Sequence, residues 1–239
     1  MPILPSVIIP VYRDADALAR TLASTDFTAA ELVVSWTRGD DSLASLREAR
    51  PDIVWVEAPR GRAPQMNAGA AFARGDWLVF LHADTRLPPG WIAAIDAARL
   101  DPRVIAGCFR FVLDSPSPMA RVIELGARAR VALLALPYGD QAIFVRRDVF
   151  EAIGGYSHLP IMEDVDLVRR LRRRGRLFRS AMPAITSARR WERDGWIRRT
   201  ARHLMLISLY FLGVAPARLT RLDPARRGHP DPPSGRMYL

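Results

Sequence analysis

Lysine is absent from this chain of 239 residues, so all 35 residues counted as lysine or arginine are arginines. Set against 25 acidic residues, they give a formal net charge of +10. Arginine suits phosphate, because its planar guanidinium can bind two oxygens at once. The charge is compatible with nucleic acid, anionic lipid or a phosphorylated substrate. Because no helix-turn-helix or aromatic-basic strand motif accompanies it, we do not expect a nucleic-acid partner.

Cysteine is nearly absent, and several common catalytic motifs are missing. The one cysteine, Cys108, excludes an internal disulfide and a cysteine-rich zinc site. Its place in the apolar run from Val104 to Phe111 predicts a buried, inert thiol. The four histidines show no metal-ligand spacing. The sequence contains no Gly-x-Ser-x-Gly elbow, P-loop or Gly-x-Gly-x-x-Gly fingerprint. It therefore does not indicate a serine nucleophile on such an elbow, or a nucleotide site of the P-loop or dinucleotide-binding type.

Long hydrophobic runs are also missing. The longest candidate, Leu204 to Leu212, is shorter than the roughly 18 residues that a membrane span needs. Met1 leads directly into a strand-like run without a basic leader, so no signal peptide is predicted and the expected location is the cytoplasm. A cytoplasmic protein with a basic, apolar tail is also compatible with the inner face of the membrane.

The sequence contains strands and helices in alternation over its first half. Strands are predicted over Val7–Ile9, Glu31–Trp36, Ile53–Val56 and Trp77–Leu81, and helices over Asp14–Ala23, Ser42–Ala49 and Ala63–Ala73. This alternation is typical of an α/β fold with a mostly parallel sheet flanked by helices. Further on, strands are predicted over Val104–Leu113 and Gln141–Val145, and helices over Met119–Leu136, Asp148–Ile153 and Asp164–Arg174.

The C-terminal part differs from the rest in composition. Residues 1–195 are predicted to form one domain, followed by an apolar and basic helix and a flexible tail over 196–239. The helix, predicted from Trp196 to Leu212, can lie in a membrane interface or dock on the domain. The last stretch, Gly228 to Leu239, is rich in proline and glycine, which predicts poor order.

An acidic side chain follows the predicted strand Trp77–Leu81. In an open α/β sheet, ligands bind beyond the carboxyl ends of the strands, and Asp84 falls at that edge. A carboxylate there suits Mg²⁺ or Mn²⁺ held against a diphosphate. The alternative is that Asp84 only caps the next turn.

A second candidate site opens the helix that follows the third predicted strand. Arg60 and Arg62 precede it, and its N-terminus offers unpaired N–H groups and the positive end of the helix dipole. Gln65 and Asn67 add hydrogen-bond donors, so this segment is a candidate anion site. The alternative is that Pro64 starts the helix and the arginines are solvated.

A third candidate is the acidic start of the helix predicted from Asp164. Glu163, Asp164 and Asp166 follow the apolar residues Ile161 and Met162. Acids favour helix N-termini, which explains at least one of the three without any function. An acid beside an apolar wall can instead serve as a general base.

Together these motifs resemble the family 2 glycosyltransferases, whose fold is called GT-A. The resemblance extends from Pro5 to Trp191 and rests on the order of these segments: Ser6–Tyr12, Arg62–Gly69, His82–Asp84, Gly139–Ala142, Gly154–Tyr156 and Glu163–Asp164. The forms Arg-Gly-Arg-Ala-x-Gln-Met-Asn and Leu-His-Ala-Asp-Thr, with the segment Ser187–Glu192, resemble a bacterial subgroup of that family.

The resemblance implies an inverting, metal-assisted transfer of a sugar from a nucleoside-diphosphate sugar to an acceptor hydroxyl. The metal, Mn²⁺ or Mg²⁺, would bind Asp84, and Asp164, paired with Glu163, would be the general base. The residues implied to contact the donor are Pro10, Val11, Tyr12, Arg13, Ser35, Arg62, His82, Ala83, Arg190 and Trp191. The apolar tail suggests a lipid or lipid-linked acceptor and a peripheral membrane contact.

The sequence departs from the family pattern at three places. Ser35 stands where an acid usually contacts the base, His82 replaces the first acid of Asp-x-Asp, and Arg13-Asp14 replaces the common Asn-Glu. Ser35 and His82 leave open a non-catalytic protein that binds sugar nucleotides or a membrane. A nucleotidyltransferase is a further alternative, but the glycine-rich loop with a lysine that it usually carries is absent.

Overall fold

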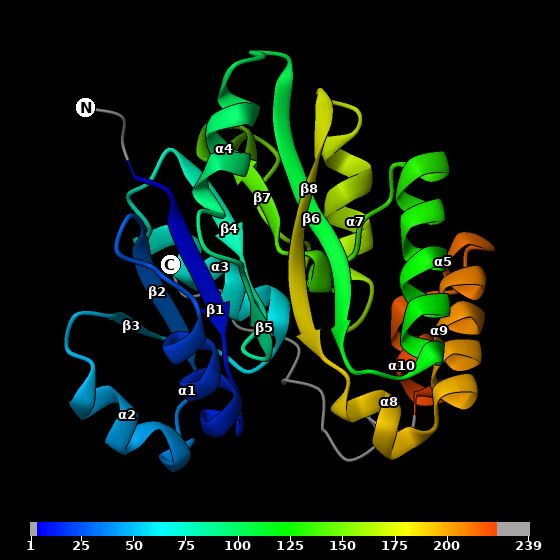
Figure 1. Cartoon of the computed structure of the whole chain (residues 1–239), viewed down its shortest axis with the longest axis horizontal. Coiled ribbons are helices and arrows are strands. Elements are labelled where there is room, and N and C mark those ends of the chain that lie inside the picture. The colour runs from blue at the N-terminus through cyan, green and yellow to red at the C-terminus, as the bar shows by residue number, and fades with distance from the viewer. Residues whose placement is uncertain (1–3, 224–239) are drawn as a thin grey trace.

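The N-terminal apolar runs form the parallel half of an eight-stranded sheet in the computed structural model, which describes residues 4–223 (Figure 1). The strands β1 (Ser6–Pro10), β2 (Glu31–Trp36), β3 (Val54–Glu57) and β4 (Trp77–Phe80) lie in the order β3-β2-β1-β4 and run parallel to one another. All four were predicted from the sequence. Their carboxyl ends therefore meet at one edge of the sheet.

The two faces of β1 pack against different helices. Val7 and Ile9 are fully buried in a cluster with Leu18 of α1 (Ala15–Ser24). Ile8 is buried in a second cluster with Met66 of α3 (Arg62–Phe72). Each such side chain contributes roughly 1.5–3 kcal/mol when it is removed from water. This alternation confirms the layered arrangement, with helices on both sides of the sheet.

Helix α3 approaches the sheet closely at Gly69. A Cβ atom at Gly69 would lie 2.5 Å from Cγ2 of Ile8 and 2.5 Å from Oγ of Ser35, so the position admits only glycine without a shift. This contact sets the first turn of α3, with Arg62, beside the carboxyl ends of β1 and β2.

The second half of the sheet is mixed. The strand β7 (Ile143–Arg146) is antiparallel to β4 and to β6 (Val104–Asp114). Next come β8 (Arg176–Ser187), parallel to β6, and β5 (Thr85–Arg86), antiparallel to β8. The sequence predicted β6 and β7 but not β5 or β8. Much of β8 is exposed or half-buried and carries arginines, so it lacks the apolar pattern by which strands are recognised.

The helices on the flanks agree with the prediction in most places. They are α2 (Ala44–Ala49, preceded by a 3₁₀ turn at Asp41–Leu43), α4 (Ile92–Arg99), α5 (Pro118–Leu134), α6 (Arg147–Ala152) and α7 (Glu163–Leu171). Helix α4 was not predicted. Helix α5 begins where the Ser117 side chain accepts a hydrogen bond from the Met119 N–H and Pro118 occupies the first turn.

The C-terminal helices α8 (Arg189–Asp194), α9 (Trp196–Phe211) and α10 (Pro216–Leu222) complete the described chain. Leu206 and Ile207 of α9 are buried in a cluster with Val165 of α7 and Leu219 of α10. Asp194 pairs with Arg199 at 2.9 Å and with Arg202 at 3.3 Å, which fixes the start of α9. Helix α9 therefore docks on the domain through one face.

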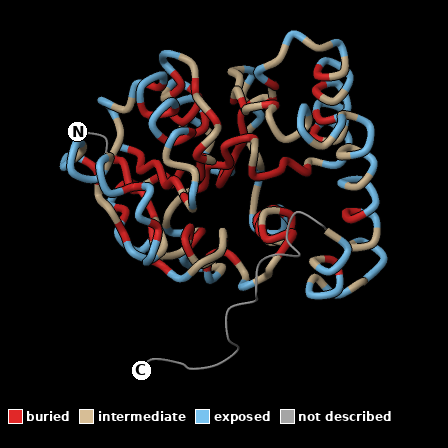
Figure 2. Tube along the Cα trace, turned by 90° about the horizontal axis from the view of Figure 1, so that it is seen from below, coloured by how far each residue is buried: buried red, intermediate tan, exposed pale blue. Residues whose placement is uncertain are grey.

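Figure 2 shows buried residues along the central strands and exposed residues on the outer helices. Among residues 4–223, no helix has both the length and the apolar character that crossing a membrane requires. The prediction of poor order for residues 228–239 concerns residues outside the described range.

Candidate functional site

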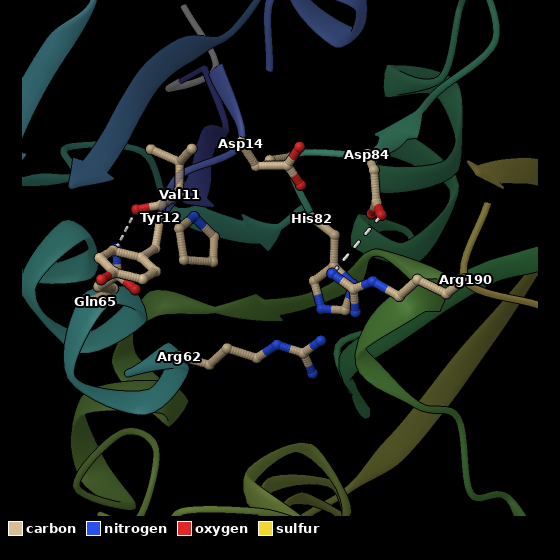
Figure 3. A pocket seen from close by; sticks show the side chains of 10 residues that line it. Val11, Tyr12, Asp14, Arg62, Gln65, His82, Asp84 and Arg190 are labelled. Carbon is tan, nitrogen blue, oxygen red and sulfur yellow. Dashed lines mark hydrogen bonds and ion pairs between the residues drawn. The ribbon is translucent and has the colours of Figure 1, made fainter. Parts of the chain in front are cut away.

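A cavity of about 140 Å³ lies at the carboxyl ends of β1 and β4 (Figure 3). Segments far apart in the sequence converge on it: the loop after β1, the N-cap of α1, the first turns of α3, the loop after β4, and α8. Its lining consists of Pro10, Val11, Tyr12, Asp14, Arg62, Gln65, His82, Ala83, Asp84 and Arg190. Nine of these ten were predicted to bind the donor or metal, and Asp14 was not.

Gln65 fixes the loop after β1 through two hydrogen bonds. Its Nε2 donates to the Val11 carbonyl at 2.7 Å and to the Ser35 carbonyl at 2.9 Å. Both amide hydrogens are therefore used within the protein, and Gln65 shapes the wall of the cavity. Because Val11 also donates its N–H to the Ser35 carbonyl at 2.9 Å, the ends of β1 and β2 are joined at this point.

Two of the predicted donor contacts lie away from the cavity. Ser35 is fully buried, and its Oγ faces Gly69 without a hydrogen-bond partner among the described residues. The Asn67 side chain donates to the Tyr156 carbonyl at 2.9 Å and accepts the Tyr156 N–H at 2.8 Å. Asn67 thus ties α3 to the turn at Gly154 and Gly155, and neither residue is placed to meet a ligand.

Arginines surround Tyr12 at the side of the cavity. The Arg60 guanidinium lies 4.4 Å from the centre of the Tyr12 ring and that of Arg13 lies 5.3 Å from it. Arg13 has a left-handed backbone (φ 50), and its N–H donates to the Asp40 carboxylate at 2.6 Å. The sequence placed Arg13 in the donor site, whereas the structure places it beside Tyr12 and outside the lining.

Positive charge converges on Asp84 from α8. The backbone N–H of Ser187 donates to the Asp84 carbonyl at 3.0 Å, so the end of β8 sets the start of α8 against the β4 loop. Arg189 Nη2 lies 3.2 Å from the Asp84 carboxylate and also pairs with Asp14, and Arg190 Nη2 lies 4.0 Å from Asp84. The sequence did not identify Arg189 or Asp14 as site residues.

The electrostatics of the cavity favour an anion. Burial and the nearby charge of Arg62 lower the pKa of Arg190. Burial, together with Arg62 and Arg190, also holds the pKa of His82 well below its usual value. His82 is therefore neutral at pH 7, and the guanidiniums repel one another in the absence of a ligand. An anion between Arg62 and Arg190 would relieve this repulsion.

The paired acids at the start of α7 point to different partners. Glu163 is buried, and its Oε1 lies 3.5 Å from Arg62 Nη1. Asp164 is half-buried and accepts the Gly139 N–H at 2.7 Å and the Val165 N–H at 2.8 Å. Glu163 is thus placed to hold Arg62, and Asp164 lies against the turn at Gly139.

Gly139 separates His82 from Asp164. A Cβ atom at this position would lie 3.0 Å from His82 Nε2 and 3.3 Å from Asp164 Oδ2. If Asp164 is the general base that the resemblance implies, Gly139→Ala should lower turnover about 10- to 100-fold, because a shift of a fraction of an ångström would disturb its catalytic geometry. Steady-state rates on purified protein would show this. As a control, Gly126→Ala, which meets nothing within 4 Å on α5, should retain full activity.

Asp140 is an acid of this region that the sequence did not single out. Its Oδ1 is buried without a hydrogen-bond partner among the described residues. Burial, opposed by Arg130 and reinforced by Asp164, raises the pKa of Asp140 to about 6. The signal available in the sequence was its position between Gly139 and Gln141, within a segment of the family pattern.

Asp140 should make stability depend on pH. Its pKa rises from 3.8 to about 6 on folding, so its ionisation costs the folded state about 2–3 kcal/mol as pH increases from 4 to above 6. Asp140→Asn removes this cost. In urea unfolding, we expect the variant to be more stable relative to the wild type at pH 8 than at pH 4. An equal difference at the two pH values would contradict the assignment.

Trp191 packs against neighbouring side chains. The Trp191 ring lies 6.3 Å from that of Phe111 and 4.9 Å from the Arg199 guanidinium. It anchors α8 and does not line the cavity, although the sequence placed it near the donor or acceptor.

Cys108 is buried, which raises its pKa to about 12 and confirms the inert thiol.

Comparison with known proteins gives a family and a fold. The profile of the family described as Glycosyl transferase family 2 matches residues 6–154, which is more than half of the chain. A pre-mycofactocin glycosyltransferase of Mycobacterium tuberculosis is 26% identical over 211 residues, covering 82% of this chain and 45% of that protein. The same match occurs in a second strain of that species. The chain thus spans about half the length of these curated relatives.

Solved structures of Staphylococcus aureus TarS have a similar fold. A fragment covering TarS residues 1–349 gives a TM-score of 0.59 at 14% identity, over 92% of this chain and 69% of that one. The same fragment in complex with UDP-GlcNAc gives 0.53 at 16% identity, over 77% of this chain and 58% of that one. At these identities the likeness shows the fold, which agrees with the GT-A architecture predicted from the sequence.

Proposed function

Since the chain belongs to glycosyl transferase family 2, we propose that it is a glycosyltransferase that moves a sugar from a nucleoside-diphosphate sugar to an acceptor hydroxyl with inversion. The observation that carries this proposal is the cavity at the ends of β1 and β4, where Arg62 and Arg190 face each other beside Asp84. A diphosphate is the anion that such a pair suits, because guanidinium binds phosphate oxygens in pairs. The UDP-GlcNAc complex of TarS supports a donor of this class.

The donor would lie across the edge of the sheet. We place its nucleoside beside Tyr12, on the wall made by Pro10, Val11 and Gln65, and its diphosphate between Arg62 and Arg190. His82 and Ala83 would then line the ribose or the first phosphate. Glu163 acts as a positioning residue, because its buried carboxylate holds the Arg62 guanidinium.

A divalent metal fits this site only together with the donor. Asp84 offers a carboxylate and His82 a neutral imidazole, but no cluster of three or more histidine, cysteine or acidic residues able to hold a metal occurs among residues 4–223. Mg²⁺ and Mn²⁺ commonly use one or two carboxylates together with substrate phosphates. When bound, the ion would neutralise charge on the leaving diphosphate. We therefore expect Mn²⁺ alone to give no heat of binding in calorimetry, and Mn²⁺ with donor to give a clear signal.

Asp164 is the proposed general base. Its two hydrogen bonds, from the N–H groups of Gly139 and Val165, fix the direction of its carboxylate. It would take the proton of the acceptor hydroxyl as that oxygen forms a bond to the anomeric carbon. The bond from this carbon to the diphosphate oxygen breaks in the same step, and the nucleoside diphosphate leaves with the electron pair. One displacement inverts the configuration without a covalent enzyme intermediate.

A lipid or lipid-linked acceptor is proposed from the position of α9. Arg190 lines the cavity on α8, and α8 leads through Gly195 into α9, whose outer face is apolar. An acceptor held at a lipid surface could therefore reach the cavity from the side of α8.

A donor screen tests the proposal. Thermal unfolding would be followed with UDP-, GDP- and dTDP-sugars, each with and without Mn²⁺, and the release of nucleoside diphosphate measured for any donor that stabilises the protein. The proposal predicts a metal-dependent shift for at least one donor, followed by release. Stabilisation without release would instead indicate a non-catalytic sugar-nucleotide-binding protein, and the absence of any shift would contradict donor binding.

A further inference from the structure

The outer face of α9 is apolar along its whole length. Leu206 and Ile207 face the domain and are buried, whereas the residues on the opposite side face solvent. At the helical repeat of 3.6 residues per turn, these solvent-facing residues share one stripe. The stripe consists of Ile197 (75% exposed), Ala201, Leu204 (57%), Met205, Phe211 and Leu212 (80%), with Ser208 as its one polar member among the described residues.

Helix α5 also exposes apolar side chains on the face that is opposite the domain. Ala120, Ala127 and Val131 are buried against the domain. The opposite side exposes Val122, Leu125, Ala129, Ala132 and Leu133. Figure 1 shows α5 and α9 at the same end of the molecule, and Ile123 of α5 packs in one cluster with Trp196 of α9. Soluble proteins rarely expose apolar surface of this extent unless it contacts a partner.

The charges on these helices identify the partner. Within the described residues, α5, α9 and α10 together carry eight arginines and a single acid, Glu124. Three of these arginines are paired with acids: Arg121 with the buried Glu124 at 2.9 Å, and Arg199 and Arg202 with Asp194 at 2.9 and 3.3 Å. Arg128 and Arg198 are exposed beside the apolar stripes of α5 and α9. An apolar face bordered by arginines matches the interface of an anionic lipid bilayer.

We propose that the stripes of α9 and α5, with their flanking arginines, form a docking surface for anionic membranes. The apolar side chains enter the boundary between headgroups and acyl chains, and Arg128 and Arg198 contact lipid phosphates. A second copy of the chain fits less well, because two such faces would bring arginines of the same sign together. None of its residues lines the cavity, so the surface is separate from the catalytic proposal, although the lipid-linked acceptor proposed above relies on the same outer face of α9.

Vesicle co-sedimentation tests the surface with the full chain and without any donor. The probes are vesicles of pure phosphatidylcholine and vesicles with about one third phosphatidylglycerol. We expect binding to the anionic vesicles that weakens as salt rises, because the arginine contribution is screened. The double variant Leu204→Glu/Met205→Glu should lose at least about tenfold in vesicle affinity. The variant Leu125→Glu should also bind more weakly than the wild type.

The matched control is Leu100→Glu, at an exposed apolar residue (86%) after α4, which should bind like the wild type. Thermal unfolding of each variant reports whether it is folded, and Arg198→Gln tests the charge without changing the apolar stripe. The proposal is overturned if anionic vesicles are bound no better than neutral ones. It is also overturned if the α9 variant binds normally, or if light scattering shows a dimer that this variant dissociates. Because no donor is present, none of these results depends on the proposed enzymatic activity.

Discussion

Asp164→Asn should reduce turnover by about 100- to 10,000-fold, the usual contribution of a general base, and leave donor binding unchanged. The amide has nearly the shape of the carboxylate, but its single oxygen can keep only one of the two hydrogen bonds, because Gly139 donates to Oδ2 and Val165 to Oδ1. It cannot take a proton from the acceptor. The loss should therefore appear in kcat, whereas the donor affinity should remain, because it is set by the residues that line the cavity and Asp164 is not one of them.

The matched control is Asp166→Asn on the same helix. Asp166 accepts from Ser157 Oγ at 2.6 Å and pairs with Arg170 at 2.8 Å, whereas Asp164 accepts from Gly139, the glycine beside His82. This variant should lose some stability but keep its turnover. Normal turnover in Asp164→Asn, or an equal loss in both variants, would remove Asp164 from the mechanism.

The second large effect concerns Asp84. In the wild type, we expect Mn²⁺ to strengthen donor binding about 5- to 150-fold, a common range for coupling between two ligands. Asp84→Asn should abolish this coupling. It should also leave metal-free donor affinity unchanged or higher, because Arg189 and Arg190 lose the carboxylate that they face and become available to the diphosphate.

Calorimetric titration of donor with and without Mn²⁺ measures both parts of this expectation. Asp76→Asn is a suitable control, because Asp76 stands just before β4, pairs with Arg99 at 2.5 Å, and lies away from the cavity. A variant at Asp84 that still responds to Mn²⁺ like the wild type would exclude this carboxylate as the metal ligand.

The strands that the sequence predicted are those rich in apolar residues. In β1 and β4 nearly every residue is apolar and buried, and the loops that follow them supply most of the cavity lining. The strand β8 was not predicted because it is partly exposed. Arg189 was missed for the same reason, since the end of β8 places α8 next to Asp84.

The sequence alone could not show whether a side chain near the end of a strand or at the start of a helix points into the cavity. Ser35 is the next-to-last residue of β2, but its side chain faces α3 at Gly69 and is buried there. Asn67, one turn into α3, points to the Tyr156 backbone and not to the cavity. Both depend on how α3 lies on the sheet. Asp14 and Asp140 acquire their surroundings only from residues distant in the sequence.

The C-terminal helix was predicted either to dock on the domain or to lie in a membrane interface, and the structure shows that one face of α9 docks on the domain. The apolar run of α9 supplies both the residues that dock on α7 and those that face solvent. The sequence alone did not show which residues belong to which face. The exposed stripe on α5 was not predicted either, because the sequence indicated only a helix over Met119–Leu136.

A crystal structure with a nucleoside-diphosphate sugar and Mn²⁺ tests the central claim most directly. It should show the diphosphate between the Arg62 and Arg190 guanidiniums, the ion joining its oxygens to the Asp84 carboxylate, and the anomeric carbon facing Asp164. A donor bound elsewhere on the protein, or an Asp84 carboxylate turned away from both ion and diphosphate, would contradict it.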